Sequence, residues 1–146
     1  MASAFTADPW MTLSRSPSFQ HGVTVEIGTL ETATSREYWF KRTAGTEDGP
    51  LISWTDTTRC PAARSLLGQV RKLKMPRVSV PWFESDEMIV TADGTHYELS
   101  GEAAYGSSSA YDFKIASNLG TPLAAWIDNS LRILEPCWSK EEPRTS

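Results

Sequence analysis

Residues 60–76 read CPAARSLLGQVRKLKMP, and this stretch decides the fold class because it carries the clearest helix signal in the chain. Pro61 suits the first position of a helix, where its missing N–H would have no partner. The apolar residues that follow share one stripe at helical spacing: Ala63, Leu66, Leu67, Val70 and Leu73. Pro76 ends the pattern, so the sequence predicts a helix over residues 61–74 with one apolar face.

A second helix is predicted over residues 121–135. Thr121 is a good N-cap, and Pro122 fits the first helical position. The apolar stripe of this helix comprises Leu123, Trp126, Ile127, Leu131 and Leu134. Pro136 follows, and two amphipathic helices are therefore expected to pack on a common partner layer.

That layer is predicted to be a β-sheet, because period-two alternation appears before and between the helices. Residues 23–27 and 36–43 each alternate, and a turn over residues 32–35 would make them a hairpin. Residues 51–55 predict a short third strand.

A second hairpin is predicted from residues 88–91 and 96–99, since the intervening Asp93-Gly94 pair favours a type I′ turn. A loose segment over residues 101–109 would then lead to a last strand. That strand would turn Tyr111, Phe113 and Ile115 to one face.

These elements predict an α+β fold, with an antiparallel sheet of about five to six strands and both helices packed on one face. The chain has 146 residues, which suits one domain. We expect a flexible N-terminal arm over residues 1–20, a single domain over residues 21–138 and a frayed tail over residues 139–146.

The two cysteines flank the two helices. Cys60 precedes the first helix, and Cys137 follows the second. If the helices pack antiparallel, the two residues approach one another and a disulfide becomes possible. The alternative is two unrelated buried thiols, because free cysteine packs as a small hydrophobe.

Charge and hydropathy limit which classes of partner the protein is expected to bind. The net charge is −4, which gives no general attraction for nucleic acid or anionic membranes. No apolar run approaches the roughly 18 residues that span a bilayer. No signal peptide is visible; a cytoplasmic location is expected if Met1 is the native start, and a periplasmic or extracellular one if a leader was removed and the cysteines are bridged.

Known chemical motifs do not nominate a catalytic residue, a metal site or a cofactor. His21 and His96 lack the short ligand spacing of a zinc motif. The serines at 107–109 lack the nucleophile-elbow pattern, and no glycine-rich phosphate loop occurs. A basic cluster lies at the C-terminal end of the predicted first helix: Arg71, Lys72, Lys74 and Arg77. It could contact an anionic partner, but the simpler explanation is that these cations complement the helix dipole.

Three aromatic residues are left outside the predicted core stripes. Trp82 and Phe83 follow Pro81, and Tyr105 stands in the loose Gly/Ser segment. Two interpretations are open for the first pair: they close one end of the core, or they recognise a partner from a loop.

The function expected from these features is a non-catalytic binding or inhibitory module that recognises a protein partner. Trp82, Phe83 and Tyr105 are its candidate partner-binding residues. The alternative is a small-molecule-binding domain or small hydrolase with a cleft between helix and sheet. A structural component of a larger assembly, with an exposed apolar patch or sheet edge, is the third class.

Overall fold

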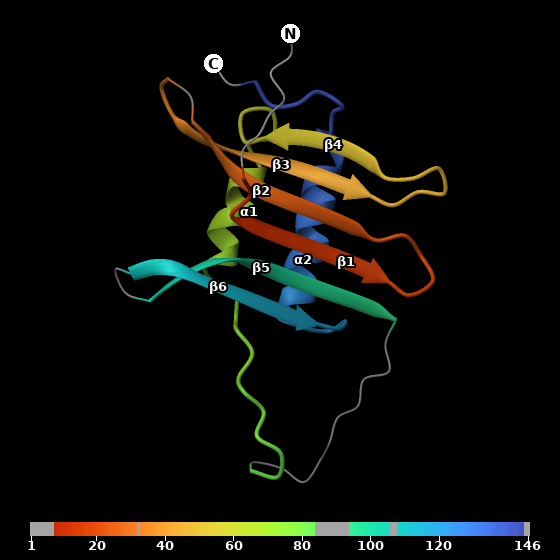
Figure 1. Ribbon diagram of the computed structural model, residues 1–146, viewed down its shortest axis with the longest axis vertical. Helices are drawn as coiled ribbons and strands as arrows, with labels where there is room; N and C mark the ends of the chain where they lie inside the picture. The colour runs from red at the N-terminus through yellow and green to blue at the C-terminus, as the bar shows by residue number, and fades with distance from the viewer. Residues whose placement is uncertain (1–7, 32, 84–93, 106–107, 145–146) are drawn as a thin grey trace.

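The computed structural model describes residues 8–31, 33–83, 94–105 and 108–144 of the chain. Six strands form one antiparallel sheet in the order β4-β3-β2-β1-β5-β6 (Figure 1). They are β1 (Met11–Pro17), β2 (Val23–Glu31), β3 (Arg36–Ala44), β4 (Leu51–Asp56), β5 (Thr95–Tyr105) and β6 (Ser108–Ser117).

Two helices cover one face of this sheet, and no described helix lies on the other face, called the open face below (Figure 1). They are α1 (Ala63–Val70) and α2 (Pro122–Leu134), and a short 3-10 turn, η1 (Glu135–Cys137), continues α2. The side chain of Thr121 accepts a hydrogen bond from the Ala124 N–H, as the capping prediction required. The predicted α+β class, with both helices on one face, is confirmed.

The main core lies between the sheet and the helices. Alternate strand residues turn inward, and the buried members from the sheet are Met11, Leu13, Val25, Ile27, Phe40, Tyr97 and Leu99. The helices contribute the following buried residues to this core: Ala63, Leu66, Leu123, Ala124, Trp126, Ile127 and Leu134. The two helices are joined by a hydrogen bond as well, since the Trp126 indole N–H donates to the Leu66 carbonyl over 3.2 Å.

A second, smaller cluster lies on the open face. Trp39, Trp54 and Leu30 are buried there, because Phe40 takes the inward position and its neighbour Trp39 must face the other way. Lys41 lies 5.5 Å from the Trp54 ring centroid and covers part of it. This corner of the open face is therefore packed rather than exposed.

The expected flexible arm is wrong for residues 11–17, which form β1 near the middle of the sheet. Met11 pairs with Ile27 on one side and with Gly101 on the other. The strand signal is weak because only Met11 and Leu13 face the core. The next inward position is Arg15, whose guanidinium reaches Asp128 of α2 at 3.2 Å.

The first helix is shorter than predicted. The α-helical part covers Ala63–Val70 rather than residues 61–74, and both ends tighten into i→i+3 turns. The Ala63 N–H donates to the Cys60 carbonyl, and the Leu73 N–H donates to the Val70 carbonyl. Both are common at helix ends, because they satisfy backbone groups that the helix leaves unpaired.

The loose segment predicted over residues 101–109 is also wrong. The β5 strand runs on to Tyr105, and β6 begins at Ser108. Gly101 suits this strand because a Cβ there would stand 2.7 Å from the Trp10 carbonyl oxygen. A close approach of two backbones, not a loop, therefore explains this glycine.

The second predicted hairpin needs a correction. Residues 88–91 lie outside the described part of the chain, but residues 97–99 of β5 have β1 on one side and β6 on the other. The β5 strand therefore forms its hairpin with β6, not with the residues before it. The predicted first hairpin is confirmed, since β2 pairs with β3 from Val23↔Ala44 to Glu31↔Arg36.

The tail is not frayed where it is described. Ser139 exchanges two backbone hydrogen bonds with Trp54, of 2.7 and 2.9 Å, and so covers part of the outer edge of β4. Arg42 supports the same region, because its guanidinium lies 4.8 Å from the Trp138 ring centroid and 3.2 Å from a Glu135 carboxylate oxygen. Pro143 is buried.

Candidate functional site

The predicted cysteine pair is joined in the structure. Cys60 and Cys137 form a disulfide with 5.7 Å between their Cα atoms. The bond ties the turn before α1 to the end of η1, as the antiparallel helix arrangement required. Because Cys60 is buried in the core, this pair is part of the framework and not a reactive site.

Trp82 and Phe83 do not close the core. They lie on a segment, residues 71–83, that leaves the end of α1 and projects away from the body of the molecule (Figure 1). Trp82 is 73% exposed and Phe83 is 78% exposed. The second interpretation of these aromatics, display on a loop, is the one that the geometry supports.

The tip of the projecting segment is a tight turn. The Phe83 N–H donates to the Val80 carbonyl over 3.2 Å. Pro81 occupies the first central position of this turn, and Trp82 has φ 65°, the left-handed region that a type II turn requires at the second. Glycine usually takes that position, so a tryptophan there costs about 1 kcal/mol.

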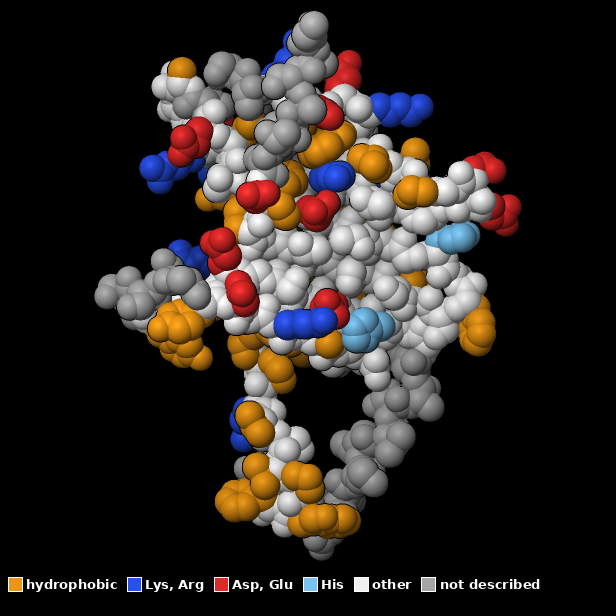
Figure 2. Space-filling view, viewed as in Figure 1, with side chains coloured by type: hydrophobic (Ala, Val, Ile, Leu, Met, Phe, Trp, Pro, Cys, Tyr) orange, Lys and Arg blue, Asp and Glu red, His pale blue; other side chains and the backbone are white. Residues whose placement is uncertain are grey.

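Further hydrophobic side chains share this segment. Met75, Val78 and Val80 are all exposed, Val78 at 91%. Figure 2 shows hydrophobic side chains gathered on the projecting segment below the body of the protein. Single exposed hydrophobic residues are ordinary on a protein surface, but five within nine residues form a concentrated apolar patch.

Tyr105 is exposed at another place. It ends β5 and lies edge-on to Tyr111 of β6, with 5.0 Å between ring centroids. Tyr105 is 75% exposed. The β5–β6 hairpin and the tip of residues 71–83 extend in different directions (Figure 1), so the structure does not join Tyr105 to Trp82 and Phe83 in one cluster.

A groove that the sequence did not reveal lies at the base of the projecting segment. It has a volume of about 290 Å³ and is bounded by the end of β6, the start of α2 and residues 74–77. Its apolar lining includes Ile115, Pro122 and Leu123, and Lys74 and Arg77 also line it. The helix dipole no longer accounts for these two cations, because α1 already ends at Val70 and the dipole effect falls off within one turn.

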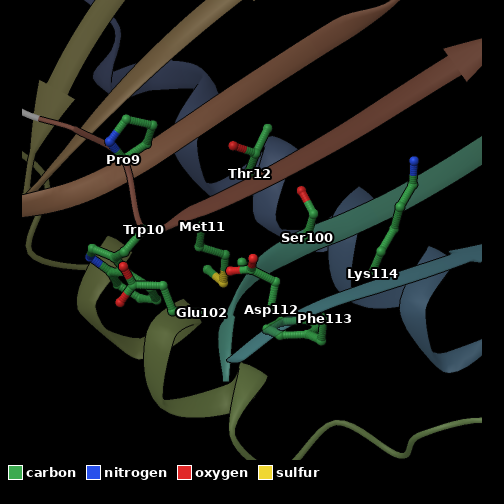
Figure 3. Close-up of a pocket in the computed structure, with 10 residues that line it drawn as sticks. Pro9, Trp10, Met11, Thr12, Ser100, Glu102, Asp112, Phe113 and Lys114 are labelled. Carbon is green, nitrogen blue, oxygen red and sulfur yellow. The ribbon is translucent and has the colours of Figure 1, made fainter. Parts of the chain in front are cut away.

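A second hollow lies where the start of β1 meets β5 and β6, and it holds about 500 Å³ (Figure 3). Glu102 and Asp112 are direct cross-strand partners there, and Trp10 and Lys114 also line the hollow. Like charges in such a pair disfavour strand pairing. Thr12 and Ser100 bring hydroxyl groups to this hollow, and no histidine or cysteine is among the described residues that line it.

Both histidines are exposed. His96 lies 3.4 Å from a Glu98 carboxylate oxygen, and Lys114 shares that carboxylate at 3.3 Å. His21 lies in the turn between β1 and β2. Within the described residues, no three His, Cys, Asp or Glu side chains gather as a metal site would require. Ser107 lies outside the described residues.

In the parts of the chain that the structure describes, no helix has the length and hydrophobicity to cross a membrane. Comparison with protein-family models, curated proteins and solved structures finds no match to this chain.

Proposed function

We propose that this protein is a non-catalytic binding module that recognises a protein partner through the projecting segment. The observation that carries the proposal is the exposure of Met75, Val78, Val80, Trp82 and Phe83 on one short stretch. Burying those side chains against a partner removes apolar surface from water, at roughly 25 cal/mol per Å².

The shape of the segment supports recognition of a partner surface. Pro76 and Pro81 restrict the backbone, so less conformational entropy is lost when the segment binds. Tryptophan is also the residue most enriched among the side chains that dominate protein interfaces. The turn at residues 80–83 places Trp82 at its second central position, at the end of the projection.

The charges near the segment indicate the character of the partner surface. Arg71, Lys72, Lys74 and Arg77 lie along its first half, whereas the chain as a whole has a net charge of −4. A partner that contacts the segment is expected to present an apolar site with carboxylate groups beside it.

The proposal is tested by affinity capture with the full chain as bait, from extracts of the cells that produce it. Trp82→Ser/Phe83→Ser is compared with the wild type and with a control, Leu51→Ser/Ile52→Ser, which removes two side chains of 45% exposure from β4. We expect one protein retained by the wild type and the control and lost by the segment variant, with purified partner repeating the difference in calorimetry.

Two results would contradict the proposal. One is equal retention by all three baits, which would place the binding surface elsewhere. The other is no protein partner but sedimentation of the wild type with vesicles of phosphatidylcholine and phosphatidylglycerol, which would make the segment a membrane contact.

The groove favours a second candidate, a small-molecule-binding domain. It lies between helix and sheet, and cations line it together with apolar side chains, a combination suited to an organic acid. Native mass spectrometry of the gently purified protein tests this candidate. A bound small acid that is lost on Lys74→Glu/Arg77→Glu substitution would support it.

A further inference from the structure

The β6 strand is an open edge of the sheet. The order β4-β3-β2-β1-β5-β6 leaves two outer strands, and Ser139 covers part of β4. In the described chain, no segment pairs with the outer side of β6. An edge of this length is normally blocked or used, because its unpaired N–H and C=O groups can accept another strand.

The backbone groups that point outward can be identified. The Glu102 N–H donates to the Trp10 carbonyl over 3.0 Å, so Glu102 faces β1. Orientation alternates along a strand, so Gly101 of β5 faces β6, and its register partner Phe113 faces back. The N–H and C=O groups of Asp112, Lys114 and Ala116 therefore point away from the sheet, toward the position of a seventh strand.

The groove lies beside this open edge. Ile115, Ala116 and Ser117 of β6 line it, together with the start of α2 and residues 74–77. Ile115 turns toward the helices, as its packing against the main core shows. Alternate side chains of an added strand would turn the same way and meet the apolar lining of the groove.

The charge on the groove selects the ligand. Lys74 and Arg77 line it, and the N-terminal end of α2 at Pro122 adds partial positive charge. A carboxylate fits there, beside an apolar side chain.

We propose that the outer edge of β6 and this groove bind an extended, acidic peptide segment of the partner as a seventh strand. The peptide bonds to the backbone of Asp112, Lys114 and Ala116, places an apolar side chain in the groove and sets a carboxylate against Lys74 and Arg77. This inference rests on the proposed function and names the part of the partner that is bound.

The probe is a phage library of random octapeptides, displayed in one form with a free C-terminus and in another without. Enriched peptides are expected to share an apolar residue with an acidic residue close by. Enrichment only from the free-terminus library would assign the carboxylate to a C-terminus, and enrichment from both would assign it to Asp or Glu side chains.

Two pairs of variants test the contacts. Lys114→Pro removes one outward N–H at a solvent-facing edge position where proline is tolerated, and Lys114→Ala is its control for the lost ion pair with Glu98. Lys74→Glu/Arg77→Glu reverses the groove charge, and Lys140→Glu/Arg144→Glu makes the same change of charge at two exposed residues of the C-terminal tail, outside the groove and the projecting segment. Selected peptides should bind the first member of each pair about tenfold more weakly, and both controls like the wild type.

No enrichment from either library, or equal binding to Lys114→Pro and the wild type, would overturn the inference. If Lys114→Pro unfolds, N-methylation of alternate residues of the selected peptide provides the same test, because it blocks strand addition from the peptide side. A partner that is lost by Trp82→Ser/Phe83→Ser but bound by Lys114→Pro would leave the proposed function standing and refute strand addition.

Discussion

The indole ring of Trp39 lies directly on Gly28 of the neighbouring strand, so close that a Cβ at residue 28 would stand 2.3 Å from the ring. Gly28 and Trp39 are register partners in β2 and β3. The Trp39 indole therefore fills the space that is free because Gly28 has no side chain. This contact is part of the small cluster on the open face.

Replacing this glycine should destabilise the protein. Gly28→Ala forces Trp39 off its position, and overpacking of this kind costs about 1–3 kcal/mol. Gly68→Ala is the matched control, since a Cβ there meets no atom within 4 Å on the exposed side of α1. The control should gain about 0.5–1 kcal/mol from helix propensity. Urea unfolding measures the free energy of unfolding of both variants. A Gly28→Ala variant as stable as the wild type would refute the contact.

The disulfide should contribute substantially to stability. Cys60→Ala/Cys137→Ala opens a loop with a sequence separation of 77 residues. Loss of that constraint should lower the free energy of unfolding by about 4 kcal/mol in the chain-entropy model. Intact mass after alkylation, with and without reduction, checks the bond itself. Two thiols that label in the folded, unreduced protein would contradict it.

Tyr97 should make stability fall at high pH. Burial raises the pKa of its phenol above the usual value, and the hydrogen bond of 2.9 Å that it donates to Asp128 acts in the same direction. Above pH 10.0 the unfolded chain then loses this proton first, so the stabilising effect disappears as pH rises toward the folded-state pKa. Urea unfolding between pH 9 and 11 should show that the free energy of unfolding falls less with pH for Tyr97→Phe than for the wild type. Near neutral pH the variant should be less stable by about 1 kcal/mol, because it lacks the hydrogen bond to Asp128. Parallel profiles would contradict this account.

Glu37 should make stability fall in acid. The Thr57 hydroxyl donates to its carboxylate, and Ser35 and Arg64 also contact it, which together hold the pKa of Glu37 below 4.5. A depressed folded-state pKa stabilises the fold above pH 4.5, and this effect is lost as pH falls through the folded-state value. The urea concentration at the unfolding midpoint should therefore fall less in acid for Glu37→Gln than for the wild type. An unchanged profile would show that the carboxylate is not charged in these contacts.

Much of the architecture could be predicted because local signals agree with tertiary packing. The Thr121-Pro122 start of α2 and the alternation in β2 and β3 each point to the face that packs. The β1 strand was not predicted, because its two inward hydrophobic residues, Met11 and Leu13, do not make a recognisable alternation. It is held by neighbours on both sides, β2 and β5, which no local pattern reveals.

The candidate site was predicted only in part. Trp82 and Phe83 could be singled out because no predicted core stripe accounted for them. The groove could not be found, because it joins Ile115 of β6, Leu123 of α2 and Lys74, which are brought together only by the fold. Lys74 and Arg77 were noticed in the sequence, but they were explained by the dipole of a helix predicted to reach residue 74. The structure ends that helix at Val70, so this explanation fails.

The central claim is that residues 71–83 contact a protein partner, and photo-crosslinking tests it most directly. Phe83 is replaced by p-benzoylphenylalanine in the full chain, expressed in its own cells, and Ile52 is replaced in the same way as an exposed control on β4. Illumination should join the residue-83 variant to one defined protein and leave the residue-52 variant free of that adduct. The same adduct from both positions, or no protein adduct from residue 83, would contradict the claim.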